Sequence, residues 1–447
     1  MKNYFKLFSL FSFVVLALTS MSCKKSSTSG GMTTHFITDV AASNPNFSTL
    51  VVALKKTGLD VALMNSSATF TVFAPTNAAF TALLSQLNVS SVNDIPVGTL
   101  TKVLLYHVKS GAATASQIKT GYYSTLAGGP AKDYNLSMYI DITGKKINGS
   151  ANITQTDIMA DNGVIHVIDK VLLPMTIADN AVANPAFTSL VAALQKANLV
   201  SALADTTKKF TVFAPTNDAF TALLTSLGVS LSDLSAGTLS PILLYHVLSG
   251  FIPAAQVTAG YFPTLSTAFG KNVVVQVAVG SGVVLNNSSN VIATDVVATN
   301  GIIHVIDKVL LPPTVVDLAT QNSIFSTLVL AVVKADLATT LAGAGPFTVF
   351  APTNDAFTAL FASLNVSGID ALTKAQLTPI LLAHVVSGNV QSGDLMSGTV
   401  PTLNSAKSLS VAVSSGAVTI NGNINVILAN VQGSNGVVHV INKVIVP

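Results

Sequence analysis

One stretch of ten residues occurs three times in this chain, and it constrains the fold more than any other feature of the sequence. It reads Thr-Val-Phe-Ala-Pro-Thr-Asn, then two residues, then Phe. The three copies begin at Thr71, Thr211 and Thr348, so they are 140 and 137 residues apart. Solenoid repeats have periods of about 20–50 residues, whereas this spacing is the size of an ordinary domain. We therefore predict three consecutive domains over residues 33–174, 175–312 and 313–447.

Two further phrases keep the same spacing, and each contains a histidine. One is an apolar helical segment that ends in a histidine, and the other is an Asn-Gly pair that opens an apolar run. The histidines of the first phrase are His107, His246 and His384, and those of the second are His166, His304 and His439. Three phrases in a fixed order, three times over, indicate one folding unit in triplicate.

The composition suits chains that fill hydrophobic cores. Half of the residues are hydrophobic and only 9% are charged, which excludes disorder for the repeats. All basic residues are lysine and all acidic ones are aspartate, and 18 of the 22 lysines lie in the repeats with all 19 aspartates. The repeats are therefore slightly acidic. Nucleic-acid binding needs a basic face, usually with arginine, so no nucleic-acid partner is expected.

The N-terminal segment 1–22 is typical of a targeting signal. Lysines precede an apolar run from Leu7 to Leu18, which is too short to span a membrane as a helix. Small residues then precede Cys23, the single cysteine of the chain, which excludes an internal disulfide. This resembles a bacterial lipoprotein signal, although Ser20 stands where such signals usually carry leucine. It implies lipidation of Cys23, with residues 23–32 as a flexible Ser/Thr/Gly tether. The alternatives are an ordinary signal peptide or an uncleaved anchor.

Each repeat is predicted to begin with helices and to end with strands, which favours the α+β class. Apolar residues at helical spacing precede the first phrase, as at Phe47, Leu50, Val51 and Leu54. The first phrase reads as a short strand that Pro75 ends, followed by a helix that Thr76 or Asn77 caps. We interpret Gly111, Gly250 and Gly388 as helix C-caps after the histidines. Very short links at Pro174 and Pro312 predict domains placed end to end.

Together these phrases resemble the fasciclin domain family. The resemblance rests on Thr-Val-Phe-Ala-Pro-Thr-Asn-Asp-Ala-Phe, on the central Tyr-His and on the closing Asn-Gly-Val-Ile-His-Val-Ile-Asp-Lys-Val-Leu-Leu-Pro, and it extends from about His35 to Pro447. It implies a compact α+β domain, with a β-sandwich wedge wrapped by helices, in three tandem copies. It also implies a secreted or surface-held protein that adheres to proteins, cells or matrix, and that is not an enzyme.

In animal members of this family, the Tyr-His and Asp-Ile neighbourhoods are associated with receptor contacts. The resemblance therefore implies partner-binding roles for the matching residues here, which are Tyr106, His107, Asp157, Ile158, Tyr245, His246, Asp295 and Val296. The third repeat departs from the pattern, with Ala383 before its histidine and Asn430-Val431 in place of the Asp-containing pair. If these neighbourhoods bind, the third repeat is expected to bind most weakly.

The paired histidines have three possible interpretations. The favoured one places them in the core, hydrogen-bonded to backbone or to each other, because a buried ring without partners is costly. A metal site would need further ligands, which only aspartate could supply, so no metal or other cofactor is expected. No nucleophile-elbow or HExxH-like motif is present, so no catalytic residue is expected either.

Three hypotheses for function follow from these observations. The favoured one is a lipid-anchored cell-envelope protein, expected in the outer membrane and facing the periplasm or cell surface, that adheres to an extracellular protein, matrix or polysaccharide. The second is a passive structural spacer of the envelope. The third is a small-molecule-binding or hydrolytic protein that uses the paired histidines.

Overall fold

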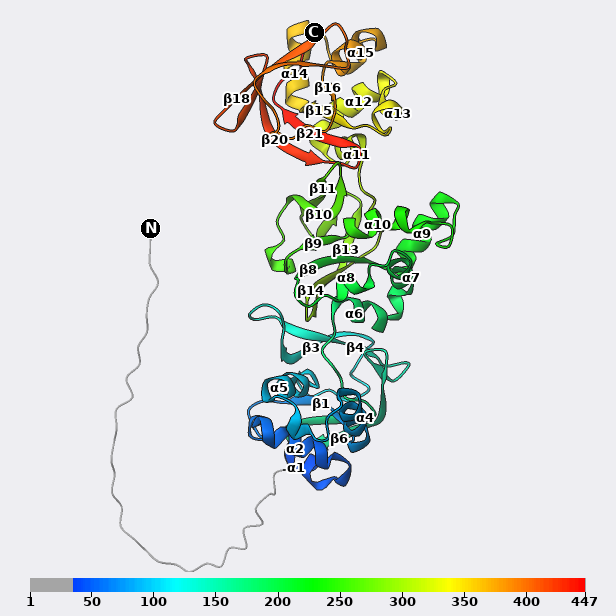
Figure 1. Ribbon diagram of the computed structural model, residues 1–447, viewed down its shortest axis with the longest axis vertical. Coiled ribbons are helices and arrows are strands. Elements are labelled where there is room, and N and C mark those ends of the chain that lie inside the picture. Colours follow the sequence, from blue (N-terminus) through cyan, green and yellow to red (C-terminus); the bar gives the residue numbers. More distant parts are fainter. Residues whose placement is uncertain (1–34, 447) are drawn as a thin grey trace, which may run out of the picture.

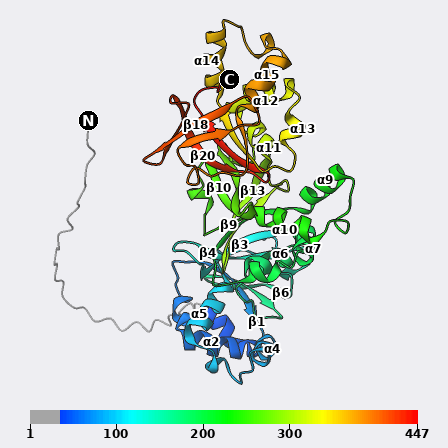
Figure 2. The same ribbon diagram turned by 45° about the horizontal axis from the view of Figure 1, so that its top comes forward.

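The computed structural model describes residues 35–446 and shows three domains stacked end to end. The two views of the ribbon agree on this arrangement (Figures 1 and 2). The predicted signal segment 1–22, the tether and Cys23 lie outside the described residues. Among the residues that are described, no helix has the length and apolar character needed to cross a membrane.

The first domain begins with short helices and ends with strands. Its helices are α1 (Ile37–Ser43), η1 (Pro45–Phe47), α2 (Ser48–Thr57), α3 (Leu59–Ala62), α4 (Asn77–Leu87), η2 (Val92–Asp94) and α5 (Val97–Tyr106). Its strands are β1 (Phe70–Pro75), β2 (Val108–Ser110), β3 (Gly121–Gly128), β4 (Asn135–Asp141), β5 (Lys146–Ile147), β6 (Ala151–Ala160) and β7 (Gly163–Ile168).

The second domain repeats this order. Its helices are α6 (Ile177–Ala183), η3 (Pro185–Phe187), α7 (Thr188–Lys196), α8 (Val200–Ala204), α9 (Asn217–Leu227), α10 (Ala236–Tyr245) and η4 (Ala254–Gln256). Its strands are β8 (Phe210–Pro215), β9 (Val247–Ser249), β10 (Gly260–Ala268), β11 (Lys271–Val279), β12 (Val283–Leu285), β13 (Ser289–Ala298) and β14 (Gly301–Ile306).

The third domain follows the same plan. Its helices are α11 (Val315–Thr320), η5 (Ser323–Phe325), α12 (Ser326–Lys334), α13 (Ala338–Leu341), α14 (Asn354–Leu364), η6 (Ile369–Ala371) and α15 (Lys374–Leu382). Its strands are β15 (Phe347–Pro352), β16 (Val385–Ser387), β17 (Gly398–Pro401), β18 (Ser408–Ser414), β19 (Ala417–Ile420), β20 (Ile424–Gln432) and β21 (Gly436–Ile441).

The strands of each domain are hydrogen-bonded into one seven-stranded arrangement. In the first domain the order is β2-β1-β7-β6-β5-β4-β3, and β1 and β7 run parallel with Phe70 opposite Gly163. The third domain has the same order. In the second domain, an additional pairing of Thr264 with Leu248 closes the sheet into a barrel. The α+β fold predicted from the repeats is thus the observed fold.

The Thr-Asn pair after β1 has two roles, of which one was predicted. The Thr76 side chain accepts a hydrogen bond from the Ala79 backbone N–H at 3.3 Å and so caps α4, as expected. Asn77 instead joins α4 to the start of α2. Its side chain accepts from the Thr49 N–H and donates to the Pro45 carbonyl, both at 2.9 Å. The other two repeats have the same contacts at Asn217 and Asn354.

The prediction that Gly111, Gly250 and Gly388 cap helices was wrong. Helix α5 ends at Tyr106 with His107 as its C-cap, and the chain then forms β2, which pairs with β1. Gly111 comes after this strand with φ near +83°. Its N–H donates to the Thr69 carbonyl at 2.8 Å. A glycine that follows a helical pattern also fits the turn after a very short strand, and only the pairing with β1 reveals that strand.

Candidate functional site

The predicted Tyr-His neighbourhood lies in the interior of the first two domains. Tyr106 and Tyr245 are both completely buried. Their hydroxyls donate to the backbone carbonyls of Ser137, at 2.7 Å, and Val274, at 2.9 Å. Burial raises the pKa of both tyrosines. A partner on the surface of the folded domain cannot touch these rings, so any contact made by this neighbourhood must involve other residues.

The histidine that follows each helix joins that helix to the last segment of its domain. The His107 Nδ1–H donates to the Val103 carbonyl at 2.7 Å, and Nε2 accepts from the Leu172 N–H at 2.8 Å. The other two repeats have equivalent pairs of contacts. They are His246 with Ile242 and Leu310, and His384 with Ile380 and Ile445. Each ring therefore holds the segment after the final strand against the helix.

These three rings are held in the neutral form. Each is 2% exposed. Burial lowers the pKa of His107, His246 and His384 to about 4. Neutrality is also required by the hydrogen bonds, because Nε2 can accept from a backbone N–H only when it carries no proton.

The strand histidines are also buried and bond to the backbone, which confirms the core interpretation and, of its two predicted kinds of partner, the backbone. His166 Nε2 donates to the Ala113 carbonyl at 3.0 Å, and Nδ1 accepts from the Asp157 N–H at 3.4 Å. Its ring stacks on Phe73 with centroids 5.5 Å apart. His304 and His439 make the same pair of backbone contacts. Burial lowers the pKa of both.

The second predicted neighbourhood is a bulge in the sixth strand of each domain. Asp157 has φ near +62°, a conformation that Asp and Asn adopt more readily than most residues. Its carboxylate accepts from the Ala115 N–H at 2.8 Å. Asp295 and Asn430 have the same conformation and the same type of bond, to Ala254 and Ser392. The substitution of Asn for Asp in the third repeat therefore preserves the acceptor.

The exposure of this neighbourhood differs between the domains. Asp157 is exposed and Ile158 is half-buried, whereas Asp295 is half-buried and Val296 is buried. Of the predicted partner-binding residues, Asp157 is thus the one that a partner can reach most directly.

The residues that the structure describes form no cluster suited to hold a metal ion. In residues 35–446, no group of three or more His, Cys, Asp or Glu side chains is placed to hold a metal ion. Both ring nitrogens of the six repeated histidines are engaged by backbone groups. None of these rings is therefore directed at a nucleophile.

The sequence did not reveal a buried asparagine clamp at Asn162, because the Asn-Gly pair was identified only as the opening of an apolar run. Asn162 is 2% exposed, and its side chain accepts from the Ile37 N–H at 2.9 Å and donates to the Leu63 carbonyl at 2.6 Å. It thereby joins the start of α1 to the end of α3. Asn300 and Asn435 make the corresponding bonds. The signal available in the sequence was the triplicate asparagine beside an apolar strand.

The first and second domains share a buried joint. The Val297 N–H donates to the Ser137 hydroxyl at 3.0 Å, and the Tyr122 hydroxyl donates to the Asn180 carbonyl at 3.2 Å. Val297 also belongs to the same buried cluster as Met138. These contacts place β3 and β4 of the first domain against α6 and β13 of the second, as Figure 2 shows.

The joint between the second and third domains uses the equivalent face. Tyr261, the counterpart of Tyr122, accepts a hydrogen bond from the Asn322 side chain at 3.0 Å. Val274 packs into the core of the third domain, and Lys271 lies 3.6 Å from Asp394. The corresponding face of the third domain has small polar exposed residues at these positions. They are Thr399, at the position of Tyr122 and Tyr261, and Ser408, at the position of Val274. This face therefore lacks the tyrosine that both joints use.

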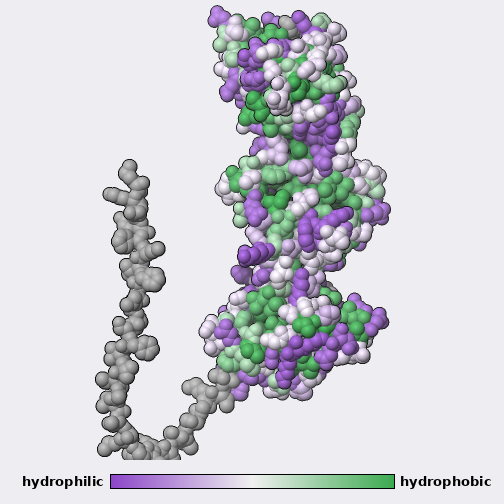
Figure 3. Space-filling model, turned by 60° about the vertical axis from the view of Figure 1, so that its left-hand side comes forward, coloured by the Kyte–Doolittle hydropathy of each residue, from purple (hydrophilic) through white to green (hydrophobic). Residues whose placement is uncertain are grey.

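A cleft of about 730 Å³ lies beside the first joint. One wall is α4, with Leu83 and Gln86, and the other is the start of α6, with Asp179 and Val182. The segment from Lys170 to Met175 forms its floor. Leu173 and Val182 are 42% and 64% exposed, so the cleft offers apolar contacts beside polar ones. Figure 3 shows that hydrophobic and hydrophilic residues are interspersed on all three lobes.

Comparisons with known proteins agree with the repeat structure. The fasciclin domain model matches residues 45–174, 185–312 and 323–447. Protein sll1483 of Synechocystis is 47% identical over 134 residues, which are 30% of this chain and 73% of that protein. Human periostin is 30% identical over 390 residues, which are 85% of this chain and 43% of periostin.

Among solved structures, a FAS1 domain pair from the insect cell adhesion molecule fasciclin I is similar to this chain. It shares 22% identity and a TM-score of 0.36, and it covers 57% of this chain and 92% of that one. The matches to the domain model extend over most of the sequence and fall on each of the three repeats. The chain therefore belongs to the fasciclin domain family and contains three consecutive copies of the domain.

Proposed function

We propose that this chain is an interaction protein of the bacterial cell envelope, held to the outer membrane by a lipid on Cys23. Its three fasciclin domains bind an extracellular protein, matrix or polysaccharide partner. Support for the anchor comes from the targeting pattern of residues 1–22 and the small residues before Cys23. Support for the binding role comes from membership of a family that includes an insect cell adhesion molecule.

The observation that carries the binding role is the cleft at the first joint. Ligand sites are commonly found at domain interfaces, and they combine apolar contact area with a few polar groups that fix orientation. This cleft has both, because Leu173 and Val182 lie beside Gln86, Lys170 and Asp179. The joint holds its two walls in place, so little ordering free energy is lost when a partner binds. Its volume of about 730 Å³ lies in the range of sites that hold small ligands, which leaves room for a short segment of a polypeptide or glycan.

Replacing both apolar residues, as Leu173→Ser with Val182→Ser, is expected to weaken partner binding at least tenfold. Fully burying an exposed Val or Leu side chain contributes roughly 1.5–3 kcal/mol, and both side chains are only partly buried before a partner binds. The measurement is capture of envelope and matrix components by the immobilised tandem, followed by titration of the captured partner. The control is Ile292→Ser, because Ile292 is 57% exposed on β13 and lies outside the cleft. Equal binding by both variants would exclude the cleft as the site.

The anchor is tested separately. Cys23→Ala is expected to move the protein from the membrane fraction to the soluble fraction of lysed cells, because no other residue supplies the thiol for lipid attachment. Ser22→Ala serves as the control, since alanine is also small. A Cys23→Ala protein that stays with the membrane would contradict the anchor.

A passive spacer is the second candidate, and the buried joints favour it. A spacer must hold a fixed length, which both joints provide through Tyr122 and Tyr261. Its function would be unaffected by the cleft substitutions and impaired by Tyr122→Ala. An interaction protein would instead lose more of its function through the cleft substitutions than through Tyr122→Ala.

A further inference from the structure

The space between the helices and the central strands differs in size between the three domains. In the first and second domains it is about 20 Å³ each. In the third domain the equivalent space is about 200 Å³. It lies among α11, α12, α13, β15 and β21, with lining residues at matching positions of the repeat.

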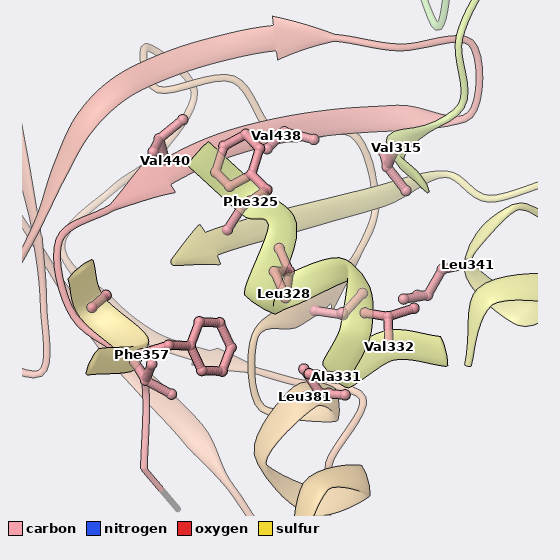
Figure 4. Close-up of a cluster of buried hydrophobic side chains, with 14 of the residues drawn as sticks. Val315, Phe325, Leu328, Ala331, Val332, Leu341, Phe357, Leu381, Val438 and Val440 are labelled. Carbon is pink, nitrogen blue, oxygen red and sulfur yellow. The ribbon is translucent and has the colours of Figure 1, made fainter. Parts of the chain in front are cut away.

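Three substitutions enlarge the interior of this cavity. Where the other domains have isoleucine or leucine, the third domain has Val315, Val332 and Val438, each one carbon atom smaller. The larger counterparts are Ile37, Leu54 and Ile165 in the first domain and Ile177, Leu194 and Ile303 in the second. Val315, Val332 and Val438 all line this cavity, and Figure 4 shows Val332 beside Leu341. The three shorter side chains therefore surround the same cavity.

The mouth of the cavity is also more apolar in the third domain. Val333, which is 62% exposed, stands on α12 where the other domains have Lys55 and Gln195. Val349 of β15 is half-buried, whereas its counterparts Val72 and Val212 are only 6% and 5% exposed. Solvent therefore reaches β15 through an apolar opening. The third domain thus combines a larger cavity with a more apolar mouth than the other two domains have.

The side chains that line the cavity are apolar apart from His384 and the exposed Thr320. Both ring nitrogens of His384 are engaged by backbone groups, and the Thr320 hydroxyl donates to the Asp317 carbonyl. A charged or strongly polar group inside would lose its hydration without compensation. An apolar cavity of about 150 Å³ holds benzene, so this one has room for roughly six to eight carbon atoms. A helix, about 10 Å across, is too wide to enter.

We propose that this cavity binds the end of an aliphatic chain, such as a medium-chain acyl group, with its polar head at the mouth. The third domain would then be a lipid- or acyl-binding domain, and the first two are not. The physical reason is that an empty apolar cavity of this size lacks the packing contacts that its lining residues make in the other domains. An aliphatic chain supplies those contacts and exposes only its head.

Titration of the full chain with octan-1-ol and with octanoate, followed by calorimetry, tests the proposal. One equivalent of either probe is expected to bind. The double variant Val332→Leu with Val438→Ile restores the residues of the other domains and is expected to bind at least tenfold more weakly. Leucine and isoleucine already occupy the two matching positions in the first and second domains, so the double variant is expected to fold. No binding by the original chain, or equal binding by the double variant, would overturn the proposal.

A surface variant keeps the test valid if the core substitutions disturb folding. Val333→Lys restores the polar rim of the first domain at a position that is mostly exposed. It is expected to weaken binding of octan-1-ol severalfold, because the alcohol must pass an ammonium group that stays hydrated. The matched control is Leu330→Lys, since Leu330 lies on the same helix, is 57% exposed and does not line the cavity. Equal affinities of these two lysine variants would contradict entry at this mouth.

Discussion

Acidification from pH 7 to pH 4 is expected to destabilise all three domains. His107, His246 and His384 have folded-state pKa values of about 4, against about 6.5 for an exposed histidine. The folded state therefore binds fewer protons than the unfolded state between these values. The contribution of each neutral ring to the free energy of unfolding is fully present above pH 6.5 and is lost as the pH falls towards 4. A shift of this size corresponds to roughly 3 kcal/mol for each domain.

Denaturant unfolding at several pH values between 7.5 and 4 measures this effect. Because exposed carboxylates titrate near pH 4, the histidine contribution is separable as the loss that begins below pH 6.5. The variant His107→Gln is expected to be less stable at pH 7 and to show a weaker pH dependence in the first domain. An unfolding free energy that stays constant between pH 6.5 and 4.5 would contradict the conclusion that these rings are buried in the neutral form.

The second large effect is expected for Asn162→Ala. This change removes the side chain that pairs with the Ile37 N–H and the Leu63 carbonyl, and it leaves both backbone groups buried without a partner. Each unsatisfied group costs about 1–3 kcal/mol, so we expect a loss of roughly 3–5 kcal/mol. Domains are typically stable by about 5–15 kcal/mol, so this loss is a large fraction of the total stability.

Hydrogen exchange of the full tandem distinguishes which domain is affected. Protection is expected to fall in α1, α3 and β1, while the second and third domains keep theirs because they retain Asn300 and Asn435. The matched control is Asn46→Ala, because Asn46 is exposed. If both alanine variants unfolded at the same denaturant concentration, the clamp would have no stabilising role.

Local features of the domain were predictable because they depend on residues close together in the chain. The Thr76 cap, the strand that ends at Pro75 and the amphipathic helices follow from local hydrogen bonding and periodicity. The interior position of the histidines was also predictable, since they lie among apolar residues at regular spacing. The three repeats supported each inference with two further copies.

The roles of several of the same residues were not predictable. Asn162 looks like an ordinary turn residue until α1 and α3 are brought beside it from about 100 residues away. The Tyr106 ring could be taken for a surface contact, because only the position of β4 shows that it is enclosed. The joint between Ser137 and Val297 connects residues 160 positions apart in different domains.

The triplicate unit of the fasciclin family, its α+β class and the favoured interior position of its histidines could all be predicted from spacing and residue type, which are properties of the chain alone. The physical differences between the repeats required the three-dimensional arrangement, because the joints, the cleft and the enlarged cavity arise where distant segments pack. One carbon atom at Val315, Val332 or Val438 is a minor change in sequence. It becomes a cavity only because all three residues surround the same space.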